Sequence, residues 1–131
     1  MKLLIVATLA ALASPPLSGR AGAATSSQLL QSCQAVLDAA GPSESDTVEI
    51  PADGLACWDY MAAVQDMSVV VDQHGRHLLG ICAPEDTTLM QYVRIFTRYA
   101  RRQPSPNDEN VGALALRALL DAFPCGVRQP T

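Results

Sequence analysis

Four cysteines are the residues of this chain with the widest choice of chemistry, because a cysteine can bind metal, act as a nucleophile or form a disulfide. They are Cys33, Cys57, Cys82 and Cys125. Their spacings of 24, 25 and 43 residues contain no CxxC pair, the usual arrangement in a zinc site. An even number of cysteines in a small exported chain predicts disulfides instead. Pairing uses every cysteine and leaves no thiol as a nucleophile.

Four cysteines allow three sets of disulfides, and the sequence alone does not choose among them. We favour Cys33 with Cys57, which joins the first predicted helix to the start of the second. We then expect Cys82 with Cys125, which ties the connection before the third helix to the tail after the fourth. Closing loops of this size stabilises a fold by about 3 to 4 kcal/mol each when only the entropy of the unfolded chain is considered.

Asp72, His74 and His77 form the other cluster that could bind a metal or transfer protons. Two histidines three residues apart match neither HExxH nor another zinc-hydrolase pattern, and Gly75 between them favours a loop. Solvent-exposed loop histidines are the better interpretation. The chain also contains no GxSxG, P-loop or paired-glycine nucleotide motif. We therefore predict no catalytic, metal or cofactor site, and a small secreted hydrolase is a minor alternative to a binding protein.

The N-terminal segment has the three parts of a cleaved signal peptide. Lys2 gives the positive start, residues 3–13 are apolar, and residues 21–24 are small enough for a signal peptidase to cut. A serine and two prolines interrupt the apolar run before it reaches the roughly 20 residues that a membrane span needs. We expect cleavage after Ala23 or Ala24, export to the periplasm, and no membrane anchor in the mature chain.

Removal of residues 1–24 leaves a strongly acidic mature chain. Its 7 basic residues against 13 acidic ones give a formal net charge of −6. This balance argues against nucleic acid and anionic membranes as partners, because both need a basic face, and it fits a basic partner. Residues 25–131 have the length of a single domain with one continuous core.

Four amphipathic segments with short connections predict an all-α fold, a small disulfide-stapled bundle of about four helices. The helices are expected to run from Ser26 or Ser27 to Gly41, from Asp53 to about Gly75, from Thr87 to Gln103, and from Ser105 to Phe123. Core positions are predicted for the aromatic residues at helical spacing, which are Trp58, Tyr60, Phe96 and Phe123.

Residues 68–81 have two interpretations. Val69, Val70 and Val71 favour a strand and Gly75 supplies a turn, so the segment can form a hairpin. We favour a helix that continues to Gly75, because an isolated two-stranded hairpin is marginally stable and no other strand pattern exists to pair with it.

The third predicted helix carries four arginines opposite its apolar face. They are Arg94, Arg98, Arg101 and Arg102. A stripe of this kind can bind acidic groups. A solvated helix face is the better explanation, since every amphipathic helix needs one.

Several short motifs follow one another in a fixed order along the chain. They are Cys57-Trp58-Asp59-Tyr60 with Ala63 and Asp66, Cys82-Ala83-Pro84 with Thr87 and Gln91, Tyr99 with Pro104, Ala118-Leu119, and Phe123-Pro124-Cys125. This combination resembles the Rap/Tai family of immunity proteins and spans nearly all of residues 25–131. Members of that family are small, helical, periplasmic proteins that protect a bacterium from peptidoglycan amidase toxins delivered by type VI secretion systems.

The resemblance implies a non-enzymatic inhibitor that binds a cysteine amidase, covers its substrate groove and often forms a homodimer. We expect the toxin contact in one of two loops, because loops on a rigid scaffold usually carry recognition. The candidate residues are His74, Gly75, Arg76 and His77 in the first loop and Asn107, Asp108 and Glu109 in the second. The alternative function is a periplasmic chaperone or stress protein that opens when its acidic residues are protonated.

Overall fold

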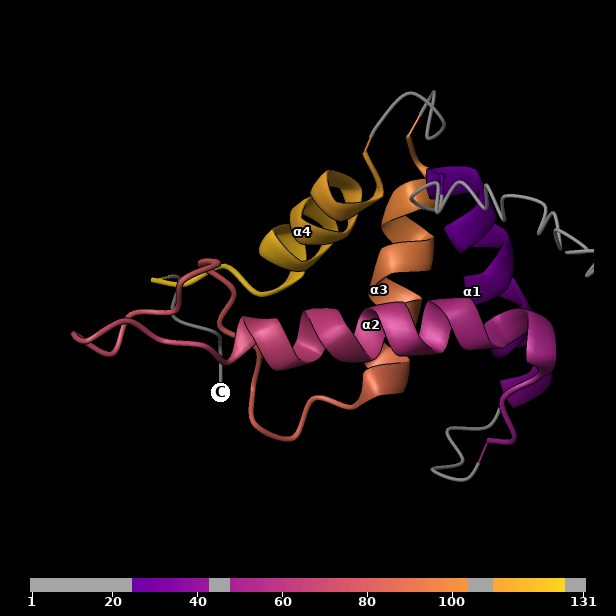
Figure 1. The fold of residues 1–131 in the computed structure, drawn as a ribbon, viewed down its shortest axis with the longest axis horizontal. Helices are drawn as coiled ribbons and strands as arrows, with labels where there is room; N and C mark the ends of the chain where they lie inside the picture. Colours follow the sequence, from indigo (N-terminus) through magenta and orange to yellow (C-terminus); the bar gives the residue numbers. More distant parts are fainter. Residues whose placement is uncertain (1–24, 43–47, 104–109, 127–131) are drawn as a thin grey trace, which may run out of the picture.

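The computed structural model describes residues 25–42, 48–103 and 110–126. These residues form four α-helices and no β-strand, which confirms the predicted all-α fold. The helices are α1 (Ser26–Ala40), α2 (Leu55–Ser68), α3 (Leu89–Arg101) and α4 (Val111–Ala122), and a short 3-10 turn η1 (Ala52–Gly54) leads into α2. In Figure 1, α2 crosses α1 and α3, and α4 lies beside α3 on the side away from α1.

Capping boxes begin α1 and α3, each within one or two positions of the predicted caps. The Thr25 hydroxyl accepts a hydrogen bond from the Gln28 N–H, and the Gln28 side chain accepts one from the Thr25 N–H. Thr88 and Gln91 make the same pair of bonds at the start of α3, so Thr88 rather than Thr87 is the cap.

The starts of α2 and α4 differ more from the prediction. Asp53 is not a cap, because it belongs to η1, and no side chain among the described residues caps α2. Asn110 begins α4, and its side-chain oxygen accepts hydrogen bonds from the N–H groups of Gly112 and Ala113. The predicted cap Ser105 lies outside the described residues, and the observed cap Asn110 is five positions beyond it.

The end of α2 corrects the preferred interpretation of residues 68–81. The helix ends at Ser68, so its predicted continuation to Gly75 is wrong. In a longer helix the Ser68 carbonyl would accept from the N–H of Asp72. Instead that carbonyl accepts from Nδ1 of His77 at 2.9 Å, and the Asp72 N–H donates to the Arg76 carbonyl at 2.9 Å. Both partners come from the returning chain.

All four helices contribute to one core. Its largest fully buried side chains include Leu29, Met61, Ile81, Tyr92, Phe96, Leu114 and Leu119. Of the aromatic residues predicted for the core, Phe96 is buried in it. Trp58, Tyr60 and Phe123 are half-buried and pack against the core from outside. No helix in the described part of the chain combines the length and apolarity needed to cross a membrane.

Both favoured disulfides are present. Cys33 and Cys57 join α1 to α2 with their Cα atoms 4.9 Å apart, and both residues are fully buried. Cys82 and Cys125 join the segment before α3 to the segment after α4, with a Cα separation of 5.0 Å. At this second disulfide Cys82 is half-buried and Cys125 is exposed.

Candidate functional site

The chain that follows α2 leaves the helical body and turns back on itself before it reaches α3 (Figure 1). We call residues 69–81 the 69–81 loop. Val71 and His77 form an isolated antiparallel bridge, and the Leu78 N–H donates to the Val70 carbonyl at 3.0 Å. The hairpin interpretation is therefore closer to the structure than the helix, although its pairing does not extend to a named strand.

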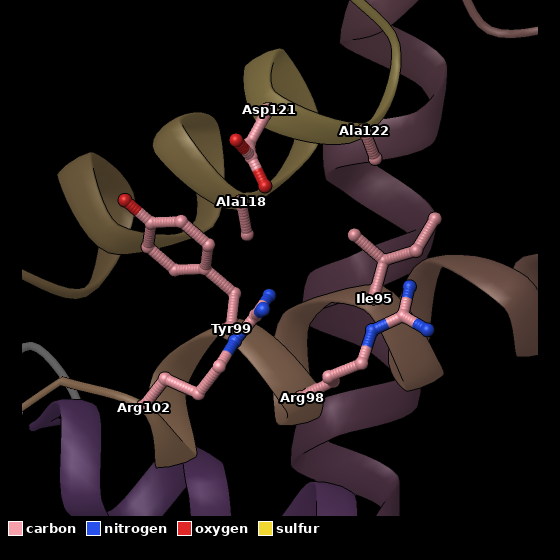
Figure 2. A pocket seen from close by; sticks show the side chains of 7 residues that line it. All are labelled: Ile95, Arg98, Tyr99, Arg102, Ala118, Asp121 and Ala122. Atoms are coloured by element: carbon pink, nitrogen blue, oxygen red, sulfur yellow. The ribbon is translucent and has the colours of Figure 1, made fainter.

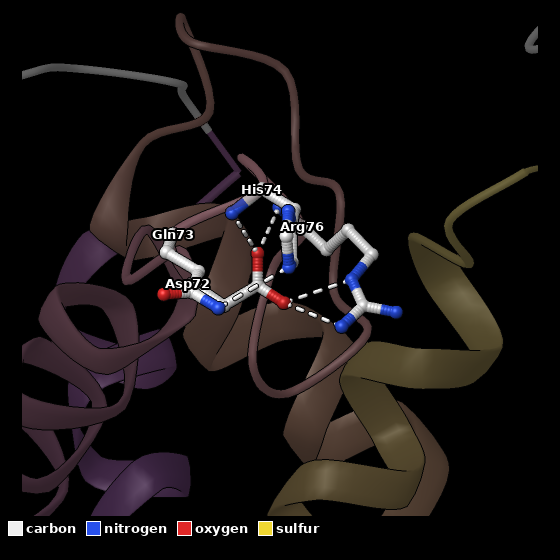
Figure 3. Close-up of polar contacts among 4 residues, drawn as sticks. All are labelled: Asp72, Gln73, His74 and Arg76. Carbon is white, nitrogen blue, oxygen red and sulfur yellow. Dashed lines mark hydrogen bonds and ion pairs between the residues drawn. The ribbon is translucent and has the colours of Figure 1, made fainter.

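The carboxylate of Asp72 organises the turn of this loop (Figure 3). Its Oδ1 accepts from the N–H groups of His74 at 2.8 Å and Arg76 at 3.0 Å. Its Oδ2 accepts from Nε of Arg76 at 2.8 Å, and Nη2 of the same guanidinium lies 2.7 Å away. Gly75 completes the turn with φ +74°, a left-handed conformation that favours glycine.

These bonds change the acidity of Asp72. The backbone N–H of Arg76, followed by the Arg76 guanidinium, holds the pKa of this carboxyl below its ordinary value. The N–H of His74 acts in the same direction with a smaller effect. The charged form that closes the turn therefore persists through neutral and mildly acidic pH.

The base of the loop is attached to the core through His77 and Ser68. Nδ1 of His77 donates to the Ser68 carbonyl, which fixes the hydrogen on that ring nitrogen. The buried Ser68 hydroxyl lies 2.7 Å from the Gln65 carbonyl, to which it donates, and 3.0 Å from the Tyr92 hydroxyl. Tyr92 is itself fully buried on α3, so the loop begins from a fixed point.

The far end of the loop is attached to the segment after α4. The Cys82 N–H donates to the Phe123 carbonyl at 2.8 Å, and the Cys125 N–H donates to the Gly80 carbonyl at 3.2 Å. The Cys82–Cys125 disulfide closes the same contact covalently. Both ends of the loop are therefore held while its turn extends away from the helices.

Large apolar side chains are exposed along this loop and at the helix end before it. We call them the apolar loop surface: Met67 (58%), Val69 (66%), Val70 (44%), Val71 (48%) and Leu78 (62%). Among the described residues, only Leu55 and Leu120 are other large apolar side chains with comparable exposure. The concentration of exposed apolar side chains in one short segment makes it the candidate interaction surface.

The four residues predicted for this loop have different roles. His74 and Arg76 are exposed, and the Arg76 guanidinium is paired with Asp72. Gly75 serves the turn, and His77 is a half-buried anchor. The second predicted contact, made of Asn107, Asp108 and Glu109, lies outside the described residues.

The apolar loop surface was missed by the sequence prediction. Its signal was the run Val69 to Val71, which was interpreted only as a preference for strand. Asp72, His74 and His77 do not converge on a common point, since Asp72 faces Arg76 and the His77 ring faces Ser68. Within the described residues, no three side chains of the metal-binding types are grouped to hold an ion.

Comparison with known proteins identifies the domain. No match to the chain was found among curated proteins or among solved structures. A family model described as Rap1a immunity proteins matches residues 25–125. The matched region contains all four helices, the 69–81 loop and both disulfides. Membership in an immunity family implies a toxin as binding partner. Because the match covers the whole helical domain, the chain belongs to the Rap1a immunity protein family.

Proposed function

We propose that this protein is a periplasmic immunity protein that binds a peptidoglycan amidase toxin of a type VI secretion system and blocks it without catalysis of its own. The family match supports a toxin partner. The signal-like N-terminus and two disulfides support the periplasm, where disulfides form and peptidoglycan lies. The observation that carries the proposal is the apolar loop surface, held on an ordered frame outside the helical body.

The construction of the loop suits the insertion of a preformed structure into a groove. A partner that contacts it does not have to order a free chain, because the Asp72 turn, the Ser68 anchor and the Cys82–Cys125 disulfide already fix its course. Preorganisation of this kind removes part of the entropic cost of association. Burial of Val70 and Leu78 against the partner then contributes directly to affinity.

Inhibition of the enzyme tests the proposal. Amidases encoded in the same genome, beginning with any whose gene adjoins this one, are assayed on purified peptidoglycan while the mature immunity protein is added in increasing amounts. We expect stoichiometric loss of hydrolysis. Failure to bind or inhibit any amidase encoded in the same genome would remove the proposed function.

Loop variants test the surface. Val70→Asp and Leu78→Asp place a charge where the partner buries an apolar side chain, and each is expected to weaken binding by at least tenfold. Leu55→Asp is the matched control, because Leu55 is also exposed but begins α2, about 20 Å of helix from its other end. Equal affinity of all three variants and the unaltered protein would exclude the loop as the contact.

Localisation and assembly need their own measurements. Cell fractionation followed by N-terminal sequencing is expected to find the protein in the periplasm, beginning at Ala24 or Thr25. Sedimentation of the purified mature protein decides whether it forms the homodimer that the family resemblance implies.

A further inference from the structure

A second surface, on α3, differs in chemistry from the apolar loop surface. Arg94 and Arg98 on α3, and Arg102 directly after its end with helical dihedral angles, follow one another at four-residue intervals, which places them along one side of the helix. We call these three residues the arginine stripe. Their guanidinium groups have no ion pair or hydrogen bond with any described residue. The stripe is therefore free to bind an anion.

Two other arginines of this protein do bind neighbouring side chains. Arg76 is bound to Asp72, and Arg101 donates to Gln34 on α1. The stripe has no such partner among the described residues, and α3 contains no acidic residue. Like charges four residues apart on a helix repel each other, so the stripe is unfavourable in the free protein and is relieved by a bound anion.

Two adjacent hollows border the stripe, and together we call them the groove. The first, about 350 Å³, lies between α3 and α4, and its lining includes Arg98, Tyr99, Arg102 and Asp121 (Figure 2). The second, about 360 Å³, includes Arg94, Arg98 and Phe123. Arg98 lines both hollows, so they adjoin each other along α3.

Both hollows also carry features that select among anions. Ile95 lines both of them and gives each an apolar wall. Asp121 on α4 faces the first hollow without an ion pair to either arginine, and Asp86 lines the second. These carboxylates repel a long polyanion such as a nucleic acid, in agreement with the net negative charge of the chain. A short segment with a few separate negative charges meets less of this repulsion.

The spacing of the stripe matches an extended peptide. Four residues of α-helix rise about 6 Å, so the three arginines span about 12 Å. Alternate residues of an extended chain are about 7 Å apart and point to the same side. Carboxylates at alternate positions can therefore each meet one guanidinium, whose planar donors suit a carboxylate.

We propose that this groove binds an extended acidic segment of the toxin, with two or three carboxylates at alternate positions. The inference rests on the proposed function, because it assigns a second contact to the same partner. The groove reaches the attached end of the 69–81 loop, since Pro84 and Phe123 line it and each lies two residues from a cysteine of the Cys82–Cys125 disulfide. One partner can thus contact both surfaces.

A peptide probe tests the groove without the toxin. Fluorescence anisotropy is measured for a labelled peptide of alternating Glu and Ser, and for the same peptide with Gln in place of Glu. We expect only the acidic peptide to bind. The triple variant R94Q/R98Q/R102Q should lose at least tenfold in affinity, and Arg98→Gln alone about twofold to fivefold. Asp121→Asn removes a repelling charge and should strengthen binding about twofold.

Arg101→Gln is the matched control, because it removes an arginine from the same helix outside the groove. Circular dichroism verifies that each variant keeps its helices. An Arg101→Gln loss equal to that of Arg98→Gln would show nonspecific attraction and overturn the proposal. Equally strong competition by inorganic phosphate would also overturn it, by showing a general anion site.

Titration with the toxin separates this inference from the proposed function. The triple variant is expected to bind the toxin about tenfold more weakly than the unaltered protein and with a smaller dependence on salt. Equal affinity and equal salt dependence would overturn the acidic-segment contact while the proposed function stands. If the unaltered protein binds no toxin, both fall, and the peptide result still decides whether the groove accepts acidic segments.

Discussion

The two disulfides of this protein lie in opposite surroundings. Cys33–Cys57 is fully buried between α1 and α2, whereas Cys82–Cys125 lies at the surface beside the attached end of the 69–81 loop. Their sequence separations of 24 and 43 residues imply similar restriction of the unfolded chain, about 3 to 4 kcal/mol each. The difference lies in the folded protein. One disulfide fills the core, and the other fixes the course of a surface segment.

The residues around Cys33–Cys57 are closely packed and joined by hydrogen bonds of the neighbouring Ser32 hydroxyl. The Ser32 hydroxyl donates to the Asp53 carbonyl at 2.6 Å and accepts from the Cys57 N–H at 3.0 Å. Around Cys82–Cys125, by contrast, apolar and charged groups remain available to solvent. The comparison separates a region built for stability from a region built to present surfaces.

Loss of the buried disulfide should have the largest effect. The double variant C33A/C57A removes the restriction of the unfolded chain and also leaves unfilled volume in the core. We expect the free energy of unfolding to fall by about 5 kcal/mol, measured by urea denaturation. A loss no greater than that of the exposed disulfide would contradict the distinction between the two regions.

Loss of the exposed disulfide should have a smaller effect on stability and a larger one on recognition. For C82A/C125A we expect a fall of about 3 kcal/mol, because little core volume is removed. Hydrogen exchange should become faster in the 69–81 loop and in the segment after α4, and toxin binding should weaken. Exchange that accelerates equally in α1 and α2 would show that this disulfide supports the whole core.

The helices were predictable from the sequence because the apolar residues that each helix buries recur at a regular spacing within one short segment. Tyr92, Val93, Phe96 and Ala100 recur at helical spacing and are all buried. The end of α2 was not predictable in this way, since the partner of the Ser68 carbonyl lies nine residues away. A local pattern contains no information about which distant side chain will donate a hydrogen bond to a given backbone carbonyl.

The candidate surfaces were predicted only in part, for a related reason. His74 and Arg76 were selected because loops on a rigid scaffold usually carry recognition, and both are exposed. Val70 was used only as a sign of strand preference. Its exposure could not be predicted, because it depends on which distant residues pack over it. The stripe was interpreted as a solvated helix face. The hollow beside it could not be foreseen, because its second wall is formed by α4. Exposure and concavity are properties of the tertiary structure.

Close packing beside the buried disulfide gives a third, intermediate effect. A Cβ atom on Gly54 would lie 2.8 Å from Cγ2 of Val36 and 3.1 Å from Cγ of Pro51. Gly54→Ala should therefore lower the free energy of unfolding by about 1 to 3 kcal/mol. In a Val36→Ala background, which removes the clashing methyl group, the same change should cost less. Equal costs in both backgrounds would show that the two residues are not coupled.

The smallest effect is expected from acid, and it should be confined to the loop. The lowered pKa of Asp72 means that its carboxylate supports the turn fully above the ordinary value of 3.8, and that this support is lost as the pH falls through the lower value in the folded protein. NMR titration should show the amide signals of His74 and Arg76 shifting below pH 3.8, while those of α1 and α2 do not follow the same transition.

Asp72→Asn separates the charge of this side chain from its hydrogen-bond geometry. An asparagine oxygen can still accept from the N–H of His74, but it cannot form the ion pair with Arg76. The variant should keep a turn at neutral pH, with faster amide exchange at Arg76, and the acid transition of the loop should disappear. A transition that persists in the variant would assign it to another acid. If Asp72 titrates at or above its ordinary pKa, the turn does not depend on its charge, and the exposed region is held by its disulfide and backbone bonds alone.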